Sequence, residues 1–159
     1  MKISLVCVGR MKAGPERELA ERYQRRAAAQ GRALGVSAVE VAELPESRAA
    51  DPARRKAEEA AAILARVGDA PLFAFDERGA ALSSAAVAGR LDRVRESGAG
   101  QLCLVIGGAD GLDASVRGRA QLVLSFGAMT LPHQLVRVLA LEQVYRLLTI
   151  IGGHPYHRA

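Results

Sequence analysis

The sequence is poor in the side chains that build disulfide frameworks and aromatic cores. Tryptophan is absent, aromatic residues make up 4% of the 159 residues, and the two cysteines are Cys7 and Cys103. Each cysteine lies inside an apolar run, "ISLVCVG" or "QLCLVIGG", which is typical of a buried strand position. Two cysteines placed in this way indicate neither a disulfide framework nor a cysteine-based zinc site. We expect both to be core residues.

Long hydrophobic runs are lacking as well. No apolar segment approaches the roughly 20 residues that cross a bilayer, and the apolar run at residues 3–8 is too short for a signal peptide. Half of the residues are nevertheless hydrophobic, which allows a real core and argues against wholesale disorder. We therefore expect a soluble, cytoplasmic protein without membrane contact, with residues 1–159 forming one domain.

Lysine is scarce in this sequence, whereas arginine is abundant. Of the 22 basic residues, Lys2, Lys12 and Lys56 are lysine and the other 19 are arginine, and the net charge is +5. Because the planar guanidinium can bond two phosphate oxygens at once, this composition favours a polyanionic partner such as nucleic acid. A proteome rich in alanine and arginine would give the same bias, and composition alone leaves both interpretations open.

Short apolar runs alternate with alanine-rich, charged segments along the whole chain. Strands are expected at residues 3–8, 36–42, 72–75, 101–106 and 122–125. Helices are expected at residues 15–29, 52–67, 84–97, 114–120 and 134–151. Asp51, Ser83 and Asp113 stand where helix caps are needed, and Gly31 is the expected stop of the first helix. The alternation predicts an α/β fold, with a mostly parallel sheet and helices on both faces.

Three loops follow expected strands, at residues 76–79, 107–111 and 126–133, and ligands of parallel sheets bind beyond such strand ends. The glycines of "GGADG" allow positive φ and close approach of a ligand, but the loop fits neither Walker A nor G-x-G-x-x-G. A tight turn is the alternative. The loop "SFGAMTLPH" is apolar, so a flat ligand such as an adenine ring, the protein core or an oligomer interface must cover it.

The expected helix at residues 134–151 is apolar nearly all round. Its charged residues are Arg137 and the i,i+4 pair Glu142 and Arg146. A helix with so few polar positions is buried on more than one side, and a second subunit is the natural cover, so we expect a homodimer through it. Arg137 lies about one turn from the preceding loop and is a candidate contact to a phosphate or a substrate carbonyl. The apolar stripe at heptad-like spacing consists of Val138, Leu141, Tyr145 and Leu148.

The tail "GGHPYHR" concentrates polar and aromatic groups. Two histidines without a third ligand argue against a metal site. Tyr156 offers a stacking face, and His157 and Arg158 offer donors, which is the set used on unstacked RNA bases. A frayed terminus is the alternative. The two glycines at residues 152–153 would let the tail bend back over a site.

These segments together resemble one family. "LVIGGADGL", "MTLPHQLVRVLALEQVYR" and the closing "HPYHR" resemble the ribosomal RNA large-subunit methyltransferase H family of the SPOUT class, and "ISLVCVGRMK" is similar to that family's start. The resemblance runs end to end and is strongest over residues 102–158. It implies a C-terminal trefoil knot, which periodicity does not reveal. It also implies S-adenosylmethionine as methyl donor, N3 of a pseudouridine in 23S rRNA as acceptor, and a homodimer that acts on assembled ribosomes.

The resemblance also implies roles for individual residues. RNA contacts would fall on Tyr156, His157 and Arg158, and on Arg137. The catalytic roles are hypotheses drawn from the residue types and their position near the apolar loop, and not from the resemblance. His157 is the candidate general base, since histidine titrates near neutral pH, although water could take the proton instead. Arg158 or Arg137 would stabilise the uracil oxyanion. The cofactor would lie among Phe75, Gly107, Phe126, Gly127, Ala128, Met129, Thr130 and Leu131.

Two other classes of protein remain as alternatives at this point. A non-catalytic RNA-binding or ribosome-assembly protein would use the same basic surface but would have no affinity for S-adenosylmethionine. A small flavodoxin-like nucleotide binder is disfavoured, because "GRMKAG" places charge where a glycine- or hydroxyl-rich phosphate loop is expected.

Overall fold

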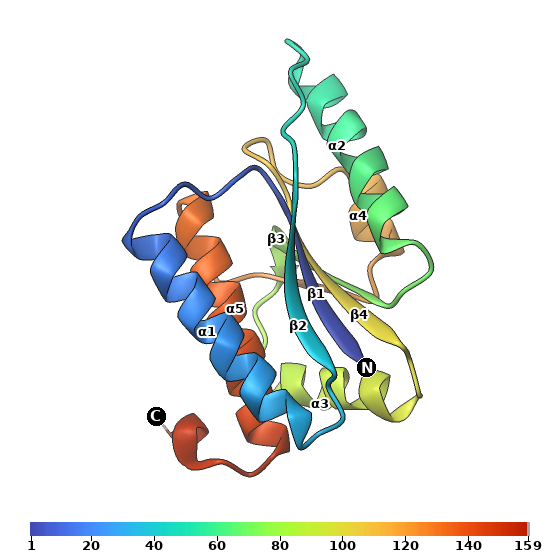
Figure 1. The fold of residues 1–159 in the computed structure, drawn as a ribbon. Coiled ribbons are helices and arrows are strands. Elements are labelled where there is room, and N and C mark those ends of the chain that lie inside the picture. The colour runs from blue at the N-terminus through green and yellow to red at the C-terminus, as the bar shows by residue number, and fades with distance from the viewer. Residues whose placement is uncertain (159) are drawn as a thin grey trace.

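The computed structural model describes residues 1–158, with side chains as far as His157. Strands and helices alternate along the chain, and a short 3₁₀ turn follows the last helix (Figure 1). The strands are β1 (Lys2–Val8), β2 (Ala38–Leu44), β3 (Leu72–Ala80), β4 (Gln101–Ile106) and β5 (Leu122–Leu124). The helices are α1 (Pro15–Arg32), α2 (Pro52–Val67), α3 (Ser84–Glu96), α4 (Ala114–Arg119), α5 (His133–Ile151) and the 3₁₀ turn η1 (Pro155–Arg158).

The strands form one parallel sheet in the order β2-β1-β4-β3-β5. Helices α1, α3 and α5 cover one face of this sheet, and α2 and α4 cover the other (Figure 1). Because successive side chains of a strand point to opposite faces, Leu5 of β1 packs in the α5 core while Val6 packs in the α2 core. The predicted α/β arrangement is confirmed. The trefoil knot that the resemblance implies stays a prediction.

The predicted helix caps and core cysteines are also confirmed. Asp51 accepts a hydrogen bond from the Arg54 amide at 2.8 Å, and Ser83 accepts one from the Ala86 amide at 3.2 Å. Each bond satisfies an amide that the first helical turn would leave unpaired. Both cysteines are buried and free. Within residues 1–158, none of the helices combines the length and hydropathy needed to cross a bilayer.

Several predicted boundaries are wrong. Strand β2 spans Ala38–Leu44, two residues later than the expected range of 36–42. Helix α1 does not stop at Gly31 but continues to Arg32. A Cβ on Gly31 would lie 2.8 Å from that of Val36, so this glycine serves the close return of the chain toward β2. Strand β3 continues past Phe75 to Ala80, where we expected a loop, because Ala80 pairs with Leu124 after a shift in register.

Helix α5 is covered on several sides by its own chain. The apolar stripe predicted to need a second subunit is buried against α1, α3 and the sheet, with Tyr145 lying 6.4 Å from Tyr23 between ring centroids. The exposed large apolar residues of α5 are instead Leu135 and Leu139, which are four residues apart. Leu135 and Leu139 thus form an apolar side of α5 that its own chain leaves exposed.

Candidate cofactor pocket and C-terminal tail

A cavity of about 290 Å³ opens at the carboxyl ends of β3, β4 and β5. This volume is near the lower end of the roughly 300–1,000 Å³ that small-molecule sites enclose. Its wall is formed by the end of β3, the two loops that follow β4 and β5, and the start of α5. The predicted cofactor residues that line it are Phe75, Gly107, Phe126, Gly127, Met129, Thr130 and Leu131. Ala128 is exposed in the same loop and is not part of the lining.

Two stacked phenylalanines form the apolar part of this wall. The rings of Phe75 and Phe126 lie 5.0 Å apart between centroids and are nearly parallel, at 5°. Phe126 still exposes 38% of its surface. Its loop is held by Ser125, whose hydroxyl accepts from the Gly127 amide at 3.1 Å and donates to the Gly127 carbonyl at 3.0 Å. The cavity therefore has a flat apolar side that suits an aromatic ring.

The glycine loop after β4 forms the opposite, backbone-lined side. Gly111 has a φ of 80°, and its amide donates to the Gly108 carbonyl at 3.0 Å. A Cβ on Gly107 would lie 2.9 Å from the Gly111 carbonyl. These contacts within the loop account for its glycines as a tight turn, and residues 107–111 line the cavity.

Charged side chains complete the lining, and several of them were not predicted. Lys56 comes from α2 and Arg117 from α4, while His133 begins α5. Arg117 lies 3.5 Å from the carboxylate of Asp76 and also donates to the Leu112 carbonyl. No local pattern marks Lys56 or Arg117, because each belongs to an ordinary charged helix that only the tertiary fold brings to the cavity.

Arg137 is not brought to this cavity. Its guanidinium is buried, with 7% of the residue exposed, and donates to the carboxylate of Glu43 and, at 2.9 Å, to the Gly9 carbonyl. It lines a second cavity of about 300 Å³, between α1 and the end of β2, together with Met11 and Gln24. In this position it ties α5 to the ends of β1 and β2.

The tail is packed on α5 rather than extended. The ring of Tyr156 lies 4.5 Å from that of Tyr145, and the Arg146 guanidinium lies 5.0 Å from the Tyr156 ring. The Tyr156 hydroxyl donates to Glu142 at 3.1 Å, and burial together with this contact raises the pKa of Tyr156. His157 contacts the His154 carbonyl. The backbone of Arg158 ends η1, and its side chain lies outside the described residues.

The start of α5 lines the cavity, whereas the tail follows the other end of this helix. Figure 1 shows that the two ends of α5 lie far apart. The helix has 19 residues, which at the usual rise makes it about 28 Å long. His133 at its start lines the cavity, while the Tyr156 side chain folds back along the second half of the helix, from Tyr145 to Glu142 at its middle. The candidate cofactor residues are therefore gathered within one chain, but the candidate RNA-binding residues of that chain are not beside them.

Comparison with known proteins identifies the family. The family model described as "Predicted SPOUT methyltransferase" matches residues 1–157. The chain is 60% identical over 160 residues to the ribosomal RNA large subunit methyltransferase H of Methylorubrum populi, with coverage of 99% of this chain and 97% of that protein. The protein of the same name from Bradyrhizobium diazoefficiens is 54% identical, with 100% of both chains covered. The chain belongs to the ribosomal RNA large subunit methyltransferase H family.

Solved structures support the fold. A probable methyltransferase from Bordetella pertussis Tohama I superposes with a TM-score of 0.53 at 13% identity, covering 92% of this chain and 95% of that one. Identity this low speaks for the architecture alone. Together with the family match, it confirms the expected α/β SPOUT fold.

The Glu43–Arg137 pair predicts an acid-dependent contribution to stability. Burial alone would raise the pKa of Glu43, but hydrogen bonds from the Met11 amide and Arg137 outweigh it and hold that pKa below its usual value. A lowered folded-state pKa stabilises the fold above the unfolded pKa of about 4.3, and the contribution disappears as pH falls through the folded value. We expect Glu43→Gln to lower the free energy of unfolding near neutrality, because the charged contact with Arg137 is lost. Solvent screens this partly exposed carboxylate, which limits the loss to about 1–2 kcal/mol.

Urea unfolding at several pH values checks this expectation. The loss caused by Glu43→Gln should shrink below about pH 4. Glu40→Gln is the matched control, since Glu40 pairs with Lys2 at 3.4 Å on the surface of the same strand and should change stability by less than about 0.5 kcal/mol. If the stability loss caused by Glu43→Gln is the same at every pH, the lowered pKa of Glu43 does not contribute to stability as proposed.

Proposed function

We propose that this chain is an S-adenosylmethionine-dependent methyltransferase that methylates N3 of a pseudouridine in 23S rRNA within assembled ribosomes. The observation that carries the proposal is the gathering of seven predicted cofactor residues around one cavity at the carboxyl end of the sheet. Membership in the methyltransferase H family supports it, and so do relatives that are named for ribosomal RNA of the large subunit.

The cavity fits this donor in shape and in chemistry. Phe75 and Phe126 provide a flat apolar wall for an adenine ring. The backbone of residues 107–111 lines the cavity and would face the donor. Lys56, which lines the cavity, offers a charge complementary to a carboxylate. When bound, S-adenosylmethionine supplies an electrophilic methyl group, so the protein has to orient the acceptor and manage one proton.

The proton on N3 must leave during transfer. His157 is the proposed base, with the alternative that the tail only clamps the RNA while water takes the proton. Arg158 is proposed to stabilise the developing oxyanion, and Tyr156 to stack on an RNA base. Arg137 would need to give up its bonds to Glu43 and Gly9 to act on RNA, so we propose Arg158 in preference to it.

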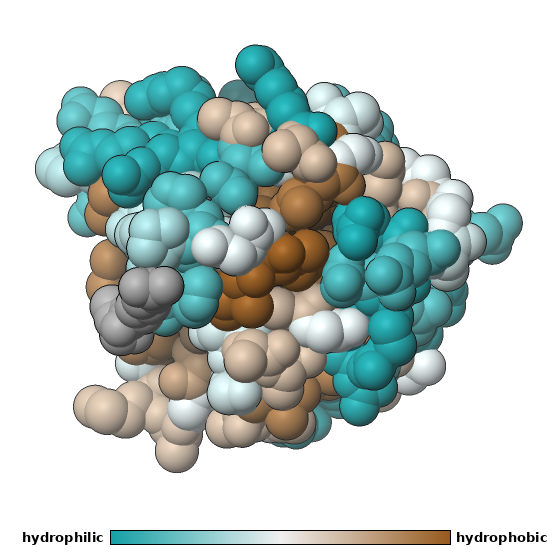
Figure 2. All heavy atoms as spheres, turned by 90° about the horizontal axis from the view of Figure 1, so that it is seen from below, coloured by the Kyte–Doolittle hydropathy of each residue, from teal (hydrophilic) through white to brown (hydrophobic). Residues whose placement is uncertain are grey.

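The length of α5 supports a homodimer. Because the cavity and the tail of one chain lie at opposite ends of this helix, a two-fold axis across α5 would place the tail of one subunit beside the cavity of the other. Leu135 and Leu139 form the exposed apolar side of α5. On the face where α3 and the end of α5 lie, hydrophobic side chains gather in a hollow bordered by hydrophilic ones (Figure 2). Half-buried apolar residues of these two elements are Val94, Ile150 and Ile151.

Methyl transfer from labelled S-adenosylmethionine tests the activity. We expect label in the RNA of assembled ribosomes, with free 23S rRNA and separated subunits as comparison. Binding of unlabelled S-adenosylmethionine, measured by calorimetry, separates an enzyme from a non-catalytic RNA-binding protein, which would show no heat. Absence of label from every substrate would overturn the proposal.

The role of His157 has its own test. If it removes the N3 proton, His157→Ala should lower turnover on ribosomes by about a hundredfold or more, the usual contribution of a general base. The control is Arg66→Gln, an exposed residue near the end of α2, which should retain wild-type turnover. Unchanged turnover in His157→Ala assigns proton removal to water.

The dimer is tested on the exposed side of α5. Leu139→Glu should yield a monomer in sedimentation analysis and lose methyl transfer, while its cavity still binds S-adenosylmethionine, because a charge at the centre of an apolar interface is costly. Ala29→Glu, on the exposed surface of α1, is the matched control and should stay dimeric. A wild-type protein that is monomeric at assay concentration contradicts the proposed assembly.

A further inference from the structure

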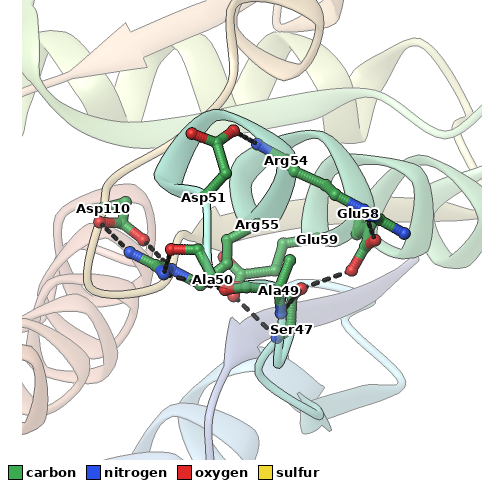
Figure 3. Close-up of polar contacts among 9 residues, drawn as sticks. All are labelled: Ser47, Ala49, Ala50, Asp51, Arg54, Arg55, Glu58, Glu59 and Asp110. Carbon is green, nitrogen blue, oxygen red and sulfur yellow. Dashed lines mark hydrogen bonds and ion pairs between the residues drawn. The ribbon is translucent and has the colours of Figure 1, made fainter.

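Helix α2 presses a buried carboxylate against the back of the glycine loop. Glu59 is 7% exposed, and its Oε1 accepts a hydrogen bond from the Ser47 amide at 3.0 Å. Its Oε2 is buried and has no hydrogen-bond partner among the described residues. Burying an unpaired carboxylate oxygen costs free energy, which suggests that Glu59 has a role that offsets this cost. Figure 3 shows Glu59 on the side of α2 that faces Ser47, next to Arg55.

The neighbour of this unpaired oxygen is Gly108. A Cβ on Gly108 would lie 2.6 Å from Glu59 Oε2 and 3.1 Å from its Cδ. Gly108 is not among the glycines with positive φ, so its backbone conformation does not itself demand glycine. Glycine is needed at position 108 because the Glu59 carboxylate occupies the space that a Cβ would take. Because Oε1 is bonded to Ser47, the carboxylate cannot swing away without breaking that bond.

Arg55 holds the other side of the same loop. Its Nε donates to Asp110 Oδ2 at 2.7 Å and its Nη2 to Asp110 Oδ1 at 3.2 Å, a two-pronged contact (Figure 3). Its Nη1 donates to the carbonyls of Ala49 and Ala50, each at 2.9 Å. The Arg55 guanidinium also lowers the pKa of Asp110. The loop is thus tied at Asp110 to α2 and to the segment before it.

We infer that Glu59 and Arg55 are positioning residues that set the shape of the cofactor cavity from behind. Neither residue lines the cavity, although Lys56 between them does. The Glu59 carboxylate packs against Gly108 and limits how closely the loop can approach α2. Arg55 holds the loop at Asp110 through its two hydrogen bonds. This inference rests on the proposed function, because it takes S-adenosylmethionine to be the ligand of that cavity.

A loop held in its bound shape lowers the ordering cost of binding. Loosening it should therefore weaken cofactor affinity without touching the transferred group. We expect Glu59→Ala and Arg55→Gln each to raise the Kd and KM for S-adenosylmethionine about tenfold, with kcat at saturation within about twofold. Glu59→Gln keeps the shape of the side chain and should lose less than Glu59→Ala.

The matched control lies on the same helix. Arg54 pairs with Glu58 at 2.9 Å on the exposed side of α2, away from the loop (Figure 3). Arg54→Gln should leave the Kd, the KM and kcat at wild-type values. Thermal unfolding of each variant identifies losses of cofactor affinity that come from destabilisation of the whole fold. A fall in kcat equal to the fall in kcat/KM would contradict a positioning role.

A double substitution tests the contact itself. Gly108→Ala should weaken S-adenosylmethionine binding because its methyl group meets Glu59. Adding Glu59→Ala removes that clash, so the double variant should bind more tightly than Gly108→Ala alone. Additive losses would overturn the inference.

Hydrogen exchange separates this inference from the proposed function. Amides of residues 107–111 should exchange faster in Glu59→Ala and Arg55→Gln than in the wild type or in Arg54→Gln, with no cofactor present. If the wild type binds no S-adenosylmethionine, the proposed function fails, while this measurement still decides the positioning role. Equal exchange in all four proteins would overturn it.

Discussion

Parallel pairing of β3, β4 and β5 is the constraint on which the candidate site depends. Parallel strands end at the same edge of a sheet, so the segments that follow them meet although they are far apart in sequence. Phe75 and Phe126 can stack for this reason, with their rings 5.0 Å apart. The glycine loop after β4 lies beside the end of β3, which is the strand between β4 and β5, and α2 supports this loop from the other face of the sheet.

Helix α5 adds the second constraint. It fills the core beside α1 with its apolar stripe and so fixes both the cavity at its start and the tail at its end. A rigid helix of 19 residues cannot bring these two ends together. We therefore propose that a second subunit supplies the RNA-binding part of the site, whereas the predicted cofactor residues that line the cavity come from one chain.

Much of this arrangement could be predicted from local patterns. Alternating apolar runs gave the sheet, and cap residues such as Asp51 and Ser83 gave the helix starts, since a cap acts on the amides of its own first turn. Most of the cavity lining at the strand ends was predictable because strand ends were recognisable and because the family resemblance named residues there.

Interactions between distant segments could not be predicted in this way. Glu43 and Arg137 are 94 residues apart, so nothing local indicates that Arg137 is bound within the core and turned away from the cavity. The same holds for Glu59 and Gly108, and for the shifted pairing that extends β3 to Ala80. The stripe on α5 was read correctly as buried, but the pattern does not say whether α1 or a partner covers it.

The most direct measurement uses mixed dimers of two defective subunits. One subunit carries Gly107→Val and Phe126→Ala in the cavity, and the other lacks the residues after Gly153. If the tail of one subunit serves the cavity of the other, each homodimer is inactive but the mixed dimer regains methyl transfer at one of its two sites. Mixed dimers that are as inactive as the parents, with dimerisation verified, would contradict completion of the site by the partner.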